Sequence, residues 1–245
     1  MDQLEANLKT LKLNYLVEHL DDFLINCEKA SLKPLEMIDR LTELEILEKN
    51  QRSTSQRIKT ARIGKFRPMQ EFDWEHPKKI DKDTIMHLFN LDFIKENRNV
   101  VIAGPQGLGK TMISRNLAYQ AAIKGHSSLF TTAAQLVMDL GSAESSVALV
   151  RKLKMYAKPR LLVIDEIGYL SFDQKSADLI FEIVNRRYET GAIVMTTNLA
   201  FKDWGEVFPG SPCVTAMIDR LTHHCEIIKI EGPSFRTKES KGKKK

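Results

Sequence analysis

A glycine-rich stretch of the sequence reads Gly104-Pro105-Gln106-Gly107-Leu108-Gly109-Lys110-Thr111. An apolar run, residues 99–103, comes directly before it, and residues 112–124 after it have the character of a helix. A triphosphate is densely anionic, so a loop that binds one needs backbone N–H groups that point inward, and glycines allow that close approach. The stretch therefore predicts a phosphate-binding loop between a strand and a helix.

Each of the eight residues of this loop is expected to lie against ATP, and two of them carry specific chemistry. Lys110 would reach the β- and γ-phosphates as a point charge, and the Thr111 hydroxyl would take a position on Mg²⁺. The alternative is a glycine turn with an incidental Lys-Thr pair, which the flanking strand and helix disfavour. ATP and Mg²⁺ are thus the expected ligands.

A second feature is the apolar run at residues 161–164, which ends in Asp165 and Glu166. At the carboxyl end of a strand beside the phosphate loop, Asp165 would hold Mg²⁺ through water, and Glu166 would polarise the attacking water as general base. Acids at the end of a strand are common and mean little alone. Together with the glycine loop, they predict an ATPase.

A third run, residues 192–195, leads through two threonines to Asn198. A neutral amide at the same edge of the sheet would orient the water between the γ-phosphate and the base. The alternative for Asn198 is a helix N-cap or a turn. We assign it to the catalytic group because three strands would deliver polar side chains to one place.

Arg220 lies far downstream, on a segment with the pattern of an amphipathic helix. A guanidinium there need not face the nucleotide of its own subunit. An arginine supplied in trans can stabilise the charge that develops at the γ-phosphate. The alternative is a surface ion pair with Asp219 or a neighbouring acid. The trans interpretation would make hydrolysis depend on assembly.

The order of these runs predicts the fold class. Short apolar or β-branched runs separated by helix-length segments are typical of an α/β protein with a parallel sheet. The expected strands are residues 99–103, 128–131, 161–165, 192–197 and 226–230. Leucine spacings of three and four before this region, and Pro34 at the start of a second stripe, predict helices. We expect a small helical domain at residues 1–65, an α/β core at 66–236 and a basic tail at 237–245.

Charge points to nucleic acid. The chain of 245 residues has a net charge of +5, but residues 52–67 contain six basic residues and no acid. Such a block suits the phosphates of DNA, and the alternative is a solvated helix face. The lysine-rich tail is expected to be a disordered, solubilising end. The expected DNA contacts within the block are Arg52, Arg57, Lys59, Arg62 and Lys65.

Composition excludes several classes of protein. The three cysteines have no metal-ligand spacing, and no leading segment resembles a secretion signal. No apolar run approaches the roughly 18 residues that a membrane span needs. We expect a reduced, cytoplasmic protein without membrane association.

The motifs together resemble the IstB-like ATPases, transposition helper proteins of insertion sequences that are related to the DnaC helicase loaders within the initiator group of AAA+ proteins. The resemblance covers nearly the whole chain and is carried by residues 104–111, 162–170, 185–189, 196–199, 204–208, 218–224 and 232–236. In the last of these, Phe235 stands where the family usually has tyrosine, so any role of that hydroxyl is lost.

The resemblance implies an AAA+ core in which ATP binding drives assembly of a homo-oligomer on double-stranded DNA. It also implies recruitment and regulation of a cognate transposase, with hydrolysis at subunit interfaces. Asn198 then looks like the first sensor and Arg220 like the finger that reaches into a neighbour's site. A helical lid is not expected, which leaves Arg236 as a substitute for a second sensor. The first helices and the basic block match the family's DNA-associated arm in placement.

Two other functions stay open at this point. A replicative helicase loader of the DnaC type would share the ATPase motifs and the affinity for DNA. A nucleotide-bound DNA scaffold would bind ATP without turnover, although Glu166 and Arg220 argue against it.

Overall fold

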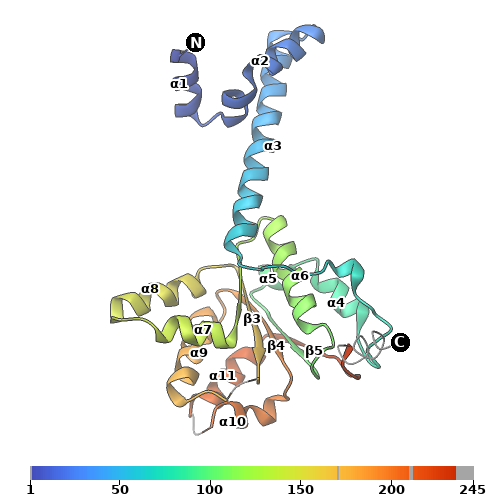
Figure 1. Ribbon diagram of the computed structural model, residues 1–245, viewed down its shortest axis with the longest axis vertical. Coiled ribbons are helices and arrows are strands. Elements are labelled where there is room, and N and C mark those ends of the chain that lie inside the picture. The colour runs from blue at the N-terminus through green and yellow to red at the C-terminus, as the bar shows by residue number, and fades with distance from the viewer. Residues whose placement is uncertain (1, 170, 210–211, 236–245) are drawn as a thin grey trace, which may run out of the picture. The chain divides into compact units, whose positions relative to one another are not determined.

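A computed structural model describes residues 2–169, 171–209 and 212–235 of the chain (Figure 1). The chain divides into two compact units, Met1–Gln56 and Arg57–Lys245. The division comes earlier than the boundary expected after residue 65, because Ala61 and Ile63 are buried in the core of the second unit, with 0% and 4% of their surface exposed. The basic block therefore ends inside the second unit. Arg236 and the basic tail, residues 237–245, lie outside the described residues.

The first unit is helical, as predicted. It contains α1 (Asp2–Leu11), α2 (Asn14–Lys29) and most of α3 (Pro34–Thr60). Pro34 opens α3, because its fixed φ suits the first helical turn. The apolar stripes of the helices meet in a small core, and the Leu16 amide donates to Glu45 Oε1 at 3.0 Å, which ties α2 to α3. The fully buried members of that core are Leu8, Leu16, Phe23 and Cys27.

The second unit is built on a parallel sheet of five strands in the order β2-β3-β4-β1-β5 (Figure 1). The predicted fold class is confirmed, and each expected strand is present. The central strands are buried along nearly their whole length, as expected when helices cover both faces. Their bounds are β1 (Asn99–Ala103), β2 (Ser128–Thr132), β3 (Leu161–Ile167), β4 (Ala192–Thr197) and β5 (Cys225–Lys229).

Helices cover the two faces of this sheet separately. Alternate residues of a strand point to opposite faces. Val100 and Ile102 accordingly pack with residues of α6 (Lys110–Ile123), whereas Val101 packs with residues of α7 (Ala133–Gly141), α9 (Gln174–Arg187) and α11 (Cys213–Thr222). The remaining helices are α4 (Lys82–Leu88), α5 (Asp92–Lys95), α8 (Ser146–Ala157), α10 (Trp204–Val207) and the short 3₁₀ turns η1 (Met69–Glu71) and η2 (Phe201–Asp203).

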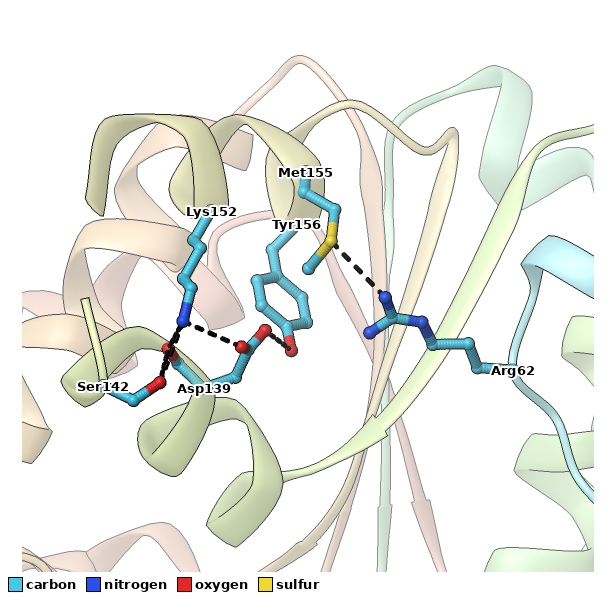
Figure 2. A network of polar contacts seen from close by, with 6 residues as sticks. All are labelled: Arg62, Asp139, Ser142, Lys152, Met155 and Tyr156. Carbon is cyan, nitrogen blue, oxygen red and sulfur yellow. Dashed lines mark hydrogen bonds and ion pairs between the residues drawn. The ribbon is translucent and has the colours of Figure 1, made fainter. Parts of the chain in front are cut away.

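A polar network ties α7 to α8 (Figure 2). The Tyr156 hydroxyl donates to Asp139 Oδ2 at 2.9 Å, and Lys152 Nζ donates to Ser142 Oγ at 2.9 Å and lies 3.1 Å from Asp139 Oδ1. Tyr156 is completely buried. Its burial and then its hydrogen bond to Asp139 raise the pKa of Tyr156 to about 12. The hydroxyl therefore stays a donor at neutral pH.

Removing this hydroxyl is expected to destabilise the second unit. Tyr156→Phe deletes a buried hydrogen bond to a charged acceptor, a type that contributes about 1.5–3 kcal/mol. We expect the free energy of unfolding in urea to fall by about that amount. Tyr119→Phe is the control, because the Tyr119 hydroxyl makes no hydrogen bond within the described residues. An equal loss in both variants would contradict this role of Tyr156.

Candidate nucleotide-binding site

The glycine-rich loop joins the end of β1 to the start of α6, where the sequence predicts it. Gly109 takes a left-handed conformation, with φ of 82°, and caps α6. Lys110 Nζ donates to the carbonyl oxygens of Gly104 at 2.5 Å and Pro105 at 2.7 Å. The ammonium group of Lys110 is thus held by carbonyl groups of its own loop.

Two other segments of the chain border this loop closely. A Cβ at Gly109 would collide with the ring of Phe72, and a Cβ at Gly107 would collide with the Ser234 side chain. Both glycines also have positive φ, which disfavours any side chain there. The loop is therefore enclosed by residues from before β1 and from after β5.

A cavity of about 320 Å³ lies over the loop. Its lining includes residues 107–111, Glu166 from the end of β3, and Thr196 and Thr197 from the end of β4. Ligand sites of drug-sized molecules typically start at about 300 Å³. The size, the glycine cradle and the lysine fit a nucleoside triphosphate.

The acids at the end of β3 are held by a threonine from the neighbouring strand. Thr196 Oγ1 donates to Asp165 Oδ1 at 2.5 Å and accepts from the Glu166 amide at 2.9 Å. The pairing of β3 with β4 shifts register between Ile164 and Ile167. Glu166 lies inside this irregularity with φ of +67°, a strained value for a residue other than glycine.

The irregularity has a consequence for the site. Bulges in a strand re-aim side chains and are frequent beside active sites. Here Glu166 reaches the cavity lining, whereas Asp165 stays 1% exposed beneath it. The oxygen of Thr111 and the carboxylate of Asp165 are donors of the kind that Mg²⁺ prefers. The donor set therefore fits the metal expected from the sequence.

Asn198 directly follows the end of β4. It does not belong to the cavity lining within the described residues, and its Oδ1 is buried without a hydrogen-bond partner there. A Cβ at Gly168 would lie 2.5 Å from this oxygen, so Asn198 packs against the loop that follows Glu166. Thr196 and Thr197 supply a polar part of the cavity lining. Threonine occurs in many structural settings, so the sequence alone did not mark Thr196 and Thr197 as part of the site.

Arg220 also lies outside the cavity lining of its own subunit. Its guanidinium stacks over the ring of Phe181, with the Cζ atom 4.9 Å from the ring centroid, and its Nη1 is buried without a hydrogen-bond partner among the described residues. The ion pair with Asp219 that the sequence left open is not formed there. Arg220 lies in the last turn of α11.

Sequence reasoning missed the segment before β1 that closes one side of the cavity. Arg67, Phe72 and His76 belong to the lining. Helix α6 holds this segment, because Arg115 Nη1 donates to the Lys65 carbonyl at 2.7 Å and Asn116 Nδ2 donates to the Arg67 carbonyl at 2.9 Å. The available signal was a cluster of aromatic and charged residues without periodicity, which is typical of a functional loop.

Two aromatic side chains of the second unit are buried in different settings. Phe72 packs in the core and also faces the cavity, with 8% of its surface exposed. Trp204 is fully buried. Phe72 thus belongs both to the core and to the lining of the cavity.

The residues expected to contact DNA fall into two groups. Arg52 forms ion pairs with Glu18 at 2.7 Å and Glu48 at 2.5 Å, and the hydrogen bonds to Glu48 and then Glu18 raise the pKa of Arg52. Arg57 Nε donates to the Ala122 carbonyl at 2.8 Å. These two guanidinium groups already have protein partners.

The second group is exposed and contains Lys59, Arg62 and Lys65. Figure 2 shows the guanidinium of Arg62 directed toward Met155, whose sulfur lies 3.7 Å from Nη2. A neutral sulfur does not cancel the charge of Arg62. These three residues are the basic side chains of the block that are best placed for phosphates.

The sheet order, the phosphate loop after β1 and the acids after β3 define a P-loop nucleotide-binding protein with an AAA+ fold. The chain belongs to the family of IstB-like ATP binding proteins, whose profile matches residues 6–243. It is 35% identical over 241 residues to a Pseudomonas aeruginosa protein named as the ATP-binding protein of insertion sequence IS21, covering 98% of this chain and 91% of the relative. A Bacillus thuringiensis relative named for IS232 is 36% identical over 237 residues, covering 97% and 95%.

Solved structures show the same fold at lower identity. The crystal structure of DnaI superposes with a TM-score of 0.54 at 20% identity, covering 68% of this chain and 89% of that one. The crystal structure of the DnaC helicase loader superposes with a TM-score of 0.53 at 18% identity, covering 65% and 96%. Within the described residues, no helix has both the length and the apolar character that crossing a bilayer requires.

Proposed function

We propose that this chain is an ATP-dependent regulator of insertion-sequence transposition. It assembles as a homo-oligomer on double-stranded DNA and recruits and stimulates a cognate transposase. The observation that carries the proposal is the gathering of Lys110, Thr111 and Glu166 around one cavity, in a chain whose relatives are named for insertion sequences.

The proposed chemistry is hydrolysis of ATP to ADP and phosphate. Lys110 would exchange its loop carbonyls for the β- and γ-phosphates. Thr111 and Asp165 would hold Mg²⁺, which would supply positive charge to these phosphates. Glu166 accepts a proton from the attacking water. Thr196 fixes the acids by its hydrogen bonds to Asp165 and to the Glu166 amide. Asn198, which packs against the loop after Glu166, is proposed to orient the attacking water.

The site is proposed to be completed by another subunit. Arg220 lies outside its own cavity lining, and its Nη1 has no hydrogen-bond partner among the described residues. A buried guanidinium nitrogen without a partner costs free energy, which a γ-phosphate of a neighbour would recover. Hydrolysis would then require assembly.

The basic side chains of the second unit are proposed to bind DNA. Acidic residues outnumber basic ones within residues 1–56, so the net positive charge of the chain resides in residues 57–245. The first unit therefore suits assembly better than it suits binding to a phosphate backbone. The proposed DNA-binding segment is therefore smaller than the sequence predicts, because it includes only the part of the basic block that lies in the second unit.

Neutralising Lys59, Arg62 and Lys65 together to glutamine is expected to weaken DNA binding and flatten its salt dependence. Each lost phosphate contact lowers the slope of log K against log salt by about 0.9 for duplex DNA. Fluorescence anisotropy with a labelled duplex at several salt concentrations measures this slope. The control is Arg52→Gln with Arg57→Gln, whose guanidinium groups have protein partners. An unchanged slope in the triple variant would indicate that these residues form a solvated face and do not contact DNA phosphates.

The protein that binds to the assembled chain distinguishes the proposed function from helicase loading. The likeness to the DnaC loader concerns the fold alone, at 18% identity. The protein with ATP and DNA should capture its cognate transposase. Capture of a replicative helicase in place of the transposase would contradict the proposal.

A further inference from the structure

Two segments that lie far apart in the sequence meet beside the phosphate loop. Residues 76–79 precede β1, and residues 231–235, which we call the closing strap, follow β5. Lys79 and Glu231 form an isolated antiparallel bridge, with backbone hydrogen bonds of 3.1 and 2.9 Å. Their side chains form an exposed ion pair of 3.8 Å, which adds little. The strap is thus anchored at its first residue.

The far end of the closing strap contacts the loop itself. The Phe235 amide donates to the Gly107 carbonyl at 2.9 Å. Ser234 lies so close to Gly107 that no side chain fits there. At Gly232, a Cβ would lie 2.9 Å from the Lys78 amide nitrogen, so the strap also packs against residues 77–78. A rearrangement of the loop around phosphates would therefore change the contacts of the closing strap.

His76 links the strap to the segment before β1. Its Nε2 lies 2.8 Å from the Pro233 carbonyl oxygen. A carbonyl oxygen only accepts, so the imidazole donates from Nε2 in this bond. The rings of His76 and Phe235 meet edge to face, with centroids 4.9 Å apart and planes at 87°, a favourable aromatic geometry. His76 and Phe235 both line the cavity.

The closing strap lies at the surface of the protein. Its residues are exposed or half-buried, and each hydrogen bond contributes about 0.5–1.5 kcal/mol net. This is the energetic range in which a ligand shifts a local equilibrium. Phe235 and the loop that it contacts both line the cavity, so a ligand bound there would contact both.

We propose that the closing strap is a nucleotide-responsive wall of the pocket, in which strap docking and nucleoside triphosphate binding stabilise each other through His76 and Phe235. The inference rests on the proposed binding of ATP at this cavity. Coupling of this kind is reciprocal. The nucleotide favours docking of the strap, and the docked strap raises the affinity for the nucleotide by the same factor.

Hydrogen exchange in the wild-type protein tests the coupling without any substitution. Exchange of the amides of residues 231–235 is followed by mass spectrometry with and without a saturating, non-hydrolysable ATP analogue. We expect the Phe235 amide to exchange about tenfold more slowly with the analogue, which corresponds to about 1.4 kcal/mol. Equal exchange in both samples, with analogue binding verified in the same tube, overturns the inference.

A variant of His76 tests the residue assignment. His76→Ala is expected to raise the Kd of a fluorescent ATP analogue about tenfold and to speed exchange of the strap. His76→Gln keeps a donor for the Pro233 carbonyl and should recover part of the affinity. His87→Ala, an exposed histidine of α4 outside the cavity lining, is the matched control.

The outcomes separate the two proposals. Wild-type affinity in a folded His76→Ala protein overturns the coupling role of His76 and Phe235. Failure of the wild-type protein to bind the analogue contradicts the proposed function itself. Binding and hydrolysis with an unresponsive strap contradict only the inference. If His76→Ala unfolds, the wild-type exchange experiment decides alone.

Discussion

Glu166→Gln is expected to abolish ATP hydrolysis and to leave ATP binding intact. A positioned general base contributes about 10²–10⁴ in rate, so turnover should fall by at least about 100-fold. Glutamine keeps the size of the side chain, and the backbone amide of residue 166 still donates to Thr196. The substitution removes only the carboxylate that accepts the proton. Phosphate release in single-turnover conditions measures the loss, and a fluorescent nucleotide measures binding.

Glu144→Gln makes the same change at an exposed residue outside the cavity lining, and it should hydrolyse ATP normally. Because Glu166→Gln should trap the ATP-bound state, its assembly on DNA should persist longer than that of the wild type. Turnover equal to wild type in this variant would refute Glu166 as the base. It would also revive the view of the chain as a DNA scaffold without turnover.

Arg220→Ala is expected to reduce hydrolysis in assembled protein by about 10³-fold or more, the range found for arginines that act in trans. Nucleotide binding by isolated subunits should be unchanged, since Arg220 lies outside the cavity lining of its own subunit. Arg186→Ala removes an arginine of the neighbouring helix α9 that does form a surface ion pair, with Glu182 at 2.6 Å, and serves as the control.

Mixing the two inactive variants tests the trans role directly. In a mixed assembly, an Arg220→Ala subunit keeps Glu166, and a Glu166→Gln neighbour supplies Arg220. Some interfaces then contain both groups, so partial turnover should return. Absence of any recovery in assemblies shown to contain both variants would contradict the trans role, as would loss of nucleotide binding by isolated Arg220→Ala subunits.

The sequence predicted those parts of the site whose chemistry is local. The loop at residues 104–111 and the acids at Asp165 and Glu166 have residue types and spacings that phosphate and metal demand, so they can be recognised without the fold. The strands were predictable for a similar reason, because buried parallel strands read as short apolar runs. Both kinds of signal depend only on neighbours in the chain.

The remaining parts of the site depend on contacts between distant segments. The strained backbone of Glu166 follows from the shifted pairing of β3 with β4. The support of Asp165 by Thr196 joins residues 31 positions apart, and the bond between His76 and the Pro233 carbonyl joins residues 157 positions apart. Threonine and histidine occur for many reasons, so no local pattern singles them out. The roles of Asn198 and Arg220 stay predictions.

We propose that ATP and DNA together switch this protein from free subunits to an assembly. Light scattering coupled to size exclusion measures the mass of the purified protein alone, with ATP, with duplex DNA, and with both. We predict growth well beyond the 28.0 kDa of the single chain when ATP and DNA are both present. The same mass in all four samples, at concentrations that saturate ATP binding, would contradict the account.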